Sequence, residues 1–153
     1  MFLLLISAVL MSVLCSAVQY SVNVRTGVEK YAGTDDIVKM WVENDSGEWT
    51  NLGPLNIKSR DDNERDSTNL FLFKKRLRMS SIGKGVKCVV LYIEGDDKWL
   101  LDWISVTIRS GHFAANVHYE DQVFVNTDKI WLSTDLSEGV SSLKMCSYCV
   151  NCL

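Results

Sequence analysis

The sequence has few of the residues on which most enzyme active sites depend. It contains only two histidines, His112 and His118, and their spacing is not that of a metal-binding helix. No G-x-S-x-G sequence occurs, so a serine hydrolase would have no nucleophile in its expected context. These absences indicate a non-catalytic protein.

Long apolar runs are confined to the N-terminus. Residues 2–17 (FLLLISAVLMSVLCSA) carry no charge and close on Cys-Ser-Ala, which is typical of a secretory signal peptide and short for a membrane span. No Lys or Arg precedes this run, so an uncleaved membrane anchor is the alternative. We predict a signal peptide over residues 1–17 and a secreted, extracellular product. The sequon Asn44-Asp45-Ser46, in an expected hairpin, makes Asn44 a candidate glycosylation site.

Strong charge of one sign is also missing. The chain has 16 Lys and Arg against 19 Asp and Glu, which argues against a nucleic-acid partner. Two local blocks interrupt this balance: acidic DDNERD at residues 61–66 and basic KKRLR at residues 74–78. Such blocks are usually solvated surface. No motif indicates a small-molecule substrate.

Four cysteines remain once the predicted signal peptide is removed, and an even number permits disulfides in an oxidising compartment. Cys88 lies in VKCVVLYI, where a buried free thiol is equally compatible with the pattern. The others, Cys146, Cys149 and Cys152, have CxxCxxC spacing without a nearby histidine, a weak zinc signal. We favour cross-links within or between tails for these three.

Amphipathic helical periodicity is almost absent, and alternation of apolar and polar residues dominates. Strands are expected at residues 20–26, 36–43, 49–57, 68–76, 86–94, 99–108, 112–119 and 122–125. The one proline, Pro54, suits an edge strand or a bulge. Short strands separated by Gly, Asn and Asp predict an eight-stranded antiparallel β-sandwich over residues 18–133. A polar, cysteine-containing tail is expected over residues 134–153.

Five segments in order resemble the signature blocks of the PLAT/LH2 domain: YSVNVRTG, YAGTDD, NERDSTNLF, WLLDWISVTI and VFVNTDKIWLS. This β-sandwich is found in lipoxygenases, lipases, polycystins and some bacterial alpha-toxins, and the resemblance runs from about residue 20 to residue 133. It implies a module that binds membranes and proteins. In several members, calcium-loaded loops at one end help the domain to dock on lipid.

The resemblance also implies a set of calcium ligands on the AGTD turn and a second acidic loop. The corresponding positions here are Gly33, Thr34, Asp35, Asp61, Asp62 and Glu64. Calcium takes six to eight oxygen ligands, so a mixture of carboxylate and carbonyl groups suits it. Two departures predict weak binding: Tyr31 replaces a residue that is often polar, and Lys98 replaces an aspartate before Trp99. The alternative is that Asp35 merely caps its turn.

Two aromatic residues are candidates for membrane or partner loops. Tyr31 lies beside the expected calcium turn, and Trp49 borders the expected hairpin. In contrast, Trp99 and Trp131 match family positions and are expected to be largely packed.

The sequence thus predicts a secreted binding module that docks on lipid surfaces or protein partners through loops at one end, assisted by weakly bound Ca²⁺. The alternative is a purely protein-binding module without calcium or lipid. A third hypothesis is a redox- or metal-responsive protein acting through its tail cysteines.

Overall fold

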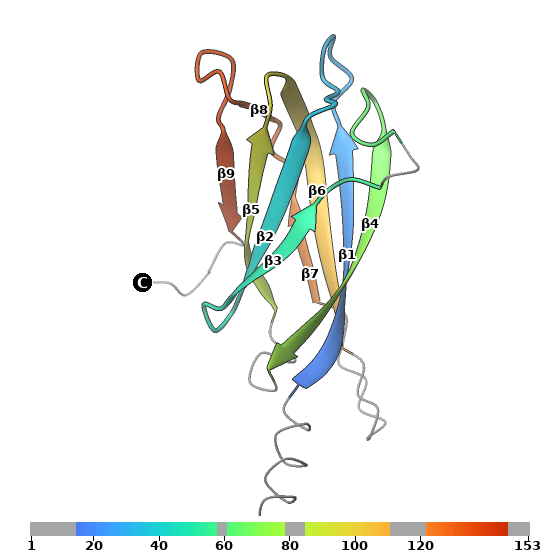
Figure 1. The fold of residues 1–153 in the computed structure, drawn as a ribbon, viewed down its shortest axis with the longest axis vertical. Helices are drawn as coiled ribbons and strands as arrows, with labels where there is room; N and C mark the ends of the chain where they lie inside the picture. The colour runs from blue at the N-terminus through green and yellow to red at the C-terminus, as the bar shows by residue number, and fades with distance from the viewer. Residues whose placement is uncertain (1–14, 58–60, 79–84, 111–121, 147–153) are drawn as a thin grey trace, which may run out of the picture.

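Two antiparallel sheets pack face to face in the computed structural model, which describes residues 15–57, 61–78, 85–110 and 122–146 (Figure 1). Sheet A has the order β4-β1-β6-β7, with β8 also pairing with β6, and sheet B has the order β3-β2-β5-β9. The nine strands are β1 (Cys15–Thr26), β2 (Ile37–Asn44), β3 (Trp49–Pro54), β4 (Thr68–Arg78), β5 (Val86–Glu94), β6 (Lys98–Ser110), β7 (Gln122–Asn126), β8 (Ile130–Ser133) and β9 (Ser142–Cys146). The predicted antiparallel β-sandwich is confirmed.

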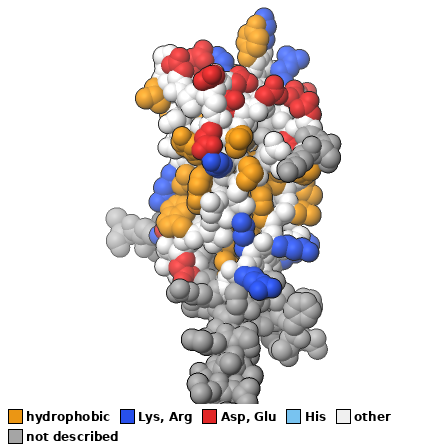
Figure 2. Space-filling view, in the orientation of Figure 1, with side chains coloured by type: hydrophobic (Ala, Val, Ile, Leu, Met, Phe, Trp, Pro, Cys, Tyr) orange, Lys and Arg blue, Asp and Glu red, His pale blue; other side chains and the backbone are white. Residues whose placement is uncertain are grey.

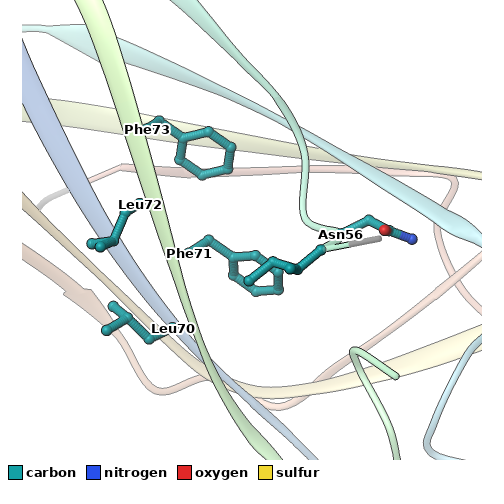
Figure 3. Close-up of a pocket in the computed structure, with 6 residues that line it drawn as sticks. Asn56, Leu70, Phe71, Leu72 and Phe73 are labelled. Carbon is teal, nitrogen blue, oxygen red and sulfur yellow. The ribbon is translucent and has the colours of Figure 1, made fainter. Parts of the chain in front are cut away.

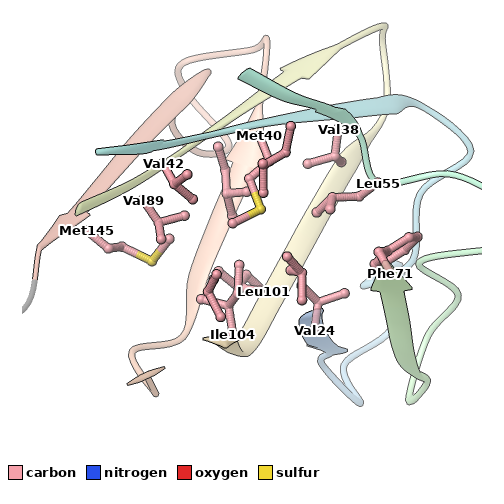
Figure 4. Close-up of a cluster of buried hydrophobic side chains, with 14 of the residues drawn as sticks. Val24, Val38, Met40, Val42, Leu55, Phe71, Val89, Leu101, Ile104 and Met145 are labelled. Carbon is pink, nitrogen blue, oxygen red and sulfur yellow. The ribbon is translucent and has the colours of Figure 1, made fainter. Parts of the chain in front are cut away.

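Alternating apolar residues from both sheets form one core. Figure 4 shows Val24 and Ile104 of sheet A together with Met40, Val89 and Met145 of sheet B, all buried. Period-2 alternation places every second side chain of a strand in this layer, which is why the sequence pattern identified most of the strands.

Two predicted features of the core and its edges are also confirmed. Trp99 is fully buried, and its indole Nε1 donates a hydrogen bond to Thr26 Oγ1 at 2.9 Å, whereas Trp131 is half-buried. Pro54 ends β3, an edge strand of sheet B whose pairing with β2 shifts register after Met40.

The strand count differs from the predicted eight because β8 and β9 are too short to produce a clear alternation. β9 lies inside the segment predicted as a tail, so the sandwich extends to Cys146 instead of ending at Ser133. Of its five residues only Met145 is buried, and a single buried residue gives no periodic signal. The strand expected at residues 112–119, with both histidines, lies outside the described residues, as does most of the predicted signal peptide.

A disulfide joins Cys88 of β5 to Cys146 of β9, across 58 positions of sequence. Of the two states left open for Cys88, the structure shows the disulfide, and the expectation of cross-links within or between tails for Cys146 is wrong. The strand register places the two cysteines directly opposite each other, a long-range relation that local spacing does not reveal. Cys149 and Cys152 lie outside the described residues.

No helix long and apolar enough to cross a membrane occurs in the part of the chain that the structure describes. The loops that follow β1, precede β4 and connect β5 to β6 lie at one end of the sandwich, since Arg25 pairs with Thr68 and Ile37 pairs with Glu94. We call this the acidic end. In the view of Figure 2, most of the visible Asp and Glu side chains gather at this end, at the top of the picture.

Candidate acidic site at one end of the sandwich

Three carboxylates from two loops converge at the acidic end. One oxygen each of Asp35, Asp61 and Glu64 lies within 4.8 Å of the others, and all three side chains are exposed. We call these three residues the acidic cluster. Asp35 belongs to the AGTD turn before β2, whereas Asp61 and Glu64 belong to the loop before β4.

Close backbone contact locks the AGTD turn onto the second loop. The Thr34 amide donates to the Asn63 carbonyl at 3.2 Å, and Thr34 Oγ1 accepts a hydrogen bond from the Asp36 amide at 3.0 Å. A Cβ atom at Gly33 would lie 2.7 Å from the Arg65 backbone nitrogen, a separation that only glycine avoids. The spacing of the carboxylates is therefore set by the backbone.

Asp62 does not join the acidic cluster, although the sequence analysis placed it among the ligands. It is 8% exposed, and its carboxylate accepts a hydrogen bond from the Ile57 amide. Its neighbour Asn63 is 3% exposed, adopts a positive φ of 63°, and donates from Nδ2 to the Leu55 carbonyl at 3.0 Å. Asp62 and Asn63 thus anchor the loop from inside, whereas Asp61 and Glu64 remain at the surface.

A small hollow of about 230 Å³ adjoins the acidic cluster. The residues around it are Tyr31, Gly33, Thr34, Asp35, Glu64, Arg65 and Asp97. Four of the six predicted ligand positions therefore line one hollow. The Thr34 hydroxyl is buried and already accepts a hydrogen bond, so the carboxylates and backbone carbonyls are the groups suited to a cation.

The electrostatics of the cluster favour a bound cation. Partial desolvation, then the nearby charges of Asp61 and Asp35, raise the pKa of Glu64 above its ordinary value. Like charges held together disfavour ionisation, and a divalent cation reverses that effect. The arrangement therefore has the oxygen-rich, self-repelling character of a site for a hard cation such as Ca²⁺.

Asp97 belongs to the same hollow but was not among the predicted ligands. Its backbone amide donates to Asp36 Oδ2 at 2.6 Å, which ties the β5–β6 turn to the start of β2. A Cβ at Gly95, where φ is +136°, would lie 1.9 Å from Asp36 Oδ1, so the turn requires glycine. The DDK sequence before Trp99 was the available signal, but its offset from the family pattern concealed the role of Asp97.

The Lys98 side chain contacts Glu138 and Trp131, which are not part of the acidic cluster. Its ammonium pairs with Glu138 Oε1 at 3.1 Å and lies 5.2 Å from the centre of the Trp131 ring. A lysine in place of an aspartate would repel a cation, but here an ion pair with Glu138 offsets the charge of Lys98.

Tyr31 and Trp49 lie at opposite ends of β2 and so do not form one docking surface. Tyr31 is 66% exposed at the rim of the acidic hollow, with the Lys30 ammonium 4.7 Å from the ring centre. Trp49 is 47% exposed but pairs with Glu43 near the far end of β2, where Lys144 lies over its ring. Of the two predicted loop aromatics, only Tyr31 belongs to the acidic end.

Asn44 holds the β2–β3 hairpin together. Its Oδ1 accepts hydrogen bonds from the amides of Ser46 and Glu48 at 2.9 and 3.0 Å, and its Nδ2 donates to Glu48 Oε2 at 3.1 Å. Attachment of a sugar would replace one of the two Nδ2 hydrogens and leave the other as a donor. Glycosylation at Asn44 stays a prediction.

A second hollow of about 230 Å³ lies along β4 (Figure 3). Its lining is mostly apolar: Asn56, Ile57, Leu70, Phe71, Leu72 and Phe73. Among the residues that the structure describes, none that lines this hollow is ionisable. The sequence analysis did not identify it.

Comparison with known proteins agrees with the fold and with the resemblance. A sequence profile of the PLAT/LH2 domain, a non-catalytic module, matches residues 20–136, and no curated protein matches the chain. Among solved structures, the Delta413-417:GS I805A variant of LOX is 18% identical with a TM-score of 0.59, and the match covers 85% of this chain and 16% of that one. The coral 8R-lipoxygenase, described as activated by calcium through a C2-like domain, is 17% identical with a TM-score of 0.54 and coverages of 84% and 16%. The alpha toxin from Clostridium absonum is 19% identical with a TM-score of 0.56 and coverages of 82% and 30%.

These three structures share the fold of this chain, which spans less than a third of their length. The profile match covers most of the chain and includes both loops of the acidic cluster. The chain belongs to the PLAT/LH2 family.

Proposed function

We propose that this chain is a secreted, non-catalytic docking module whose acidic end binds one calcium ion and then rests on a lipid surface. The observation that carries the proposal is the convergence of Asp35, Asp61 and Glu64 within 4.8 Å, beside a tyrosine that is 66% exposed. The calcium activation described for the coral lipoxygenase, through its C2-like domain, supports a similar use of this fold here.

The acidic cluster supplies up to three carboxylates, and backbone carbonyls of the hollow and water complete the ligands that calcium needs. Few ligands are fixed in advance, so the expected dissociation constant is on the order of 10⁻⁴–10⁻³ M, as in extracellular modules. Bound calcium cancels most of the local negative charge, which allows the acidic end to approach anionic headgroups. Tyr31, with an apolar ring and a polar hydroxyl, suits the membrane interface.

The exposed Trp49 at the opposite end favours a second candidate function, the docking of a protein partner without calcium or lipid. Exposed tryptophans are enriched at the energetic centres of protein interfaces. The two functions differ in which end of β2 carries the binding surface.

Flotation with phosphatidylserine-containing vesicles, with and without millimolar calcium, tests the proposal. Calcium should increase the bound fraction of the unmodified protein, and Asp35→Asn with Asp61→Asn should abolish the increase. Tyr31→Ser should reduce it, whereas Trp49→Ser, an exposed aromatic at the far end, should leave it unchanged. If calcium produces no increase in the bound fraction, the calcium proposal is wrong and the protein-docking alternative takes its place. If Trp49→Ser alone removes vesicle binding, the far end of β2 contacts the lipid and the assignment to the acidic end is wrong.

A further inference from the structure

The outward side of β4 combines exposed leucines with basic side chains. Leu70 and Leu72 are 45% and 58% exposed, and Lys74 and Arg76 are exposed two and four positions further along. The intervening Phe71 is buried. Because outward side chains repeat every second residue, these four form a row about 20 Å long. We call Leu70, Leu72, Lys74 and Arg76 the β4 row.

The neighbouring strand leaves this row accessible. On β1, the residues opposite Leu70, Leu72 and Lys74 are Asn23, Ser21 and Gln19. Their short or flexible polar side chains lie on the same face and do not bury the leucines, as the exposed fractions show. The row therefore presents apolar and cationic groups side by side on the outer face of sheet A.

The two cations have no ion-pair partner among the described residues, whereas Lys129 and Lys144 each pair with a carboxylate. Lys74 lies opposite Gln19 of β1. Gln19 is seven residues before Thr26, where β1 ends at the acidic end of the sandwich. At about 3.3 Å a residue, the acidic end is roughly 23 Å away, which is more than twice the Debye length of about 8 Å at physiological salt. The acidic cluster therefore does not neutralise Lys74 and Arg76.

We propose that the β4 row docks on an anionic bilayer surface without calcium, independently of the acidic cluster. The cations complement lipid phosphate and carboxylate groups, and the adjacent leucines enter the interfacial region. A soluble polyanion would use the cations equally well but would leave both leucines in water. Exposed leucines beside cations that have no ion-pair partner in the described part of the chain thus favour a lipid surface over a polyanion.

The expected electrostatic effect follows from the number of cations. Each Lys or Arg near an anionic membrane strengthens binding about fivefold at moderate salt. Replacing both cations should therefore weaken binding about 25-fold. High salt should have a similar effect, because the screening length falls to about 3 Å at 1 M ionic strength.

Vesicle flotation in the presence of EGTA, with and without phosphatidylserine in phosphatidylcholine vesicles, tests this proposal on the full secreted chain. The unmodified protein should float only with phosphatidylserine, and Lys74→Gln with Arg76→Gln should lose about 25-fold in partitioning. The matched control, Lys129→Gln with Lys144→Gln, removes the same charge from paired cations and should retain binding. Melting curves establish that each variant is folded.

Two further results separate the alternatives. Leu70→Thr with Leu72→Thr, which preserves strand propensity, should also lose binding; if it binds normally, the surface attracts any polyanion and the bilayer proposal is wrong. Asp35→Asn with Asp61→Asn should bind normally in EGTA, so failure of the calcium proposal leaves this one intact. Absence of flotation of the unmodified protein in EGTA would overturn the proposal.

Discussion

The disulfide between Cys88 and Cys146 fixes the last strand of the sandwich to β5, and its removal should cost a large part of the stability. The bond closes a loop of 58 positions. In the chain-entropy treatment such a loop restricts the unfolded state by about 14 cal/mol/K, or about 4 kcal/mol at 25 °C. For a domain of this size that corresponds to a fall of roughly 15 °C in the melting temperature.

Denaturant and thermal unfolding of Cys88→Ala with Cys146→Ala provide the assay, and reduced unmodified protein provides an independent comparison. The control is Cys149→Ala with Cys152→Ala, which keeps the described disulfide and should unfold like the unmodified protein. A non-reducing peptide map should connect the Cys88 and Cys146 peptides. The reasoning fails if the map connects Cys146 to Cys149, or if the double alanine variant is as stable as the unmodified protein.

Four further predictions concern the acidic end. Gly33→Ala forces a methyl group against the Arg65 backbone nitrogen and should destabilise the fold by about 1–3 kcal/mol in urea unfolding, with loss of calcium binding. Asp62→Ala leaves the Ile57 amide without its acceptor and should also cost about 1–3 kcal/mol, so a variant of unchanged stability would contradict the anchoring role. The pKa of Glu64 is higher in the folded state than in the unfolded state. Its contribution to stability is therefore present below the unfolded pKa and is lost as pH rises through the folded pKa. Glu64→Gln should stabilise the calcium-free protein at neutral pH, and melting temperatures recorded against pH measure this effect. Calcium affinity of the unmodified protein should increase with pH over the same interval, because the metal requires the ionised carboxylate.

The sequence was sufficient for the fold because most strands are long and half-buried. β2, for example, alternates polar residues with Val38, Met40 and Val42, all of which are buried. The same reasoning fails for β9, where Met145 alone faces the core, and for the disulfide, which depends on which strands are neighbours. Sheet order is a long-range property, and local periodicity contains no information about it.

The candidate site was predictable in location but not in side-chain direction. The two acidic segments were expected at one end, and the structure brings Asp35, Asp61 and Glu64 together there. Asp62 points into the protein, where its carboxylate accepts a hydrogen bond from the Ile57 amide. Nothing in the sequence distinguishes Asp62 from Asp61. Whether a loop carboxylate faces solvent or a backbone amide depends on the local φ and ψ angles, which residue type alone does not determine.

Calorimetric titration of the protein with calcium tests the central claim most directly, namely that the acidic cluster is a calcium site. The unmodified protein should bind one ion with a dissociation constant on the order of 10⁻⁴–10⁻³ M. Asp35→Asn should abolish the binding heat, whereas Asp128→Asn, which removes an exposed carboxylate outside the cluster, should leave it unchanged. Equal heats for Asp35→Asn and the unmodified protein, or no heat from the unmodified protein, would contradict the claim.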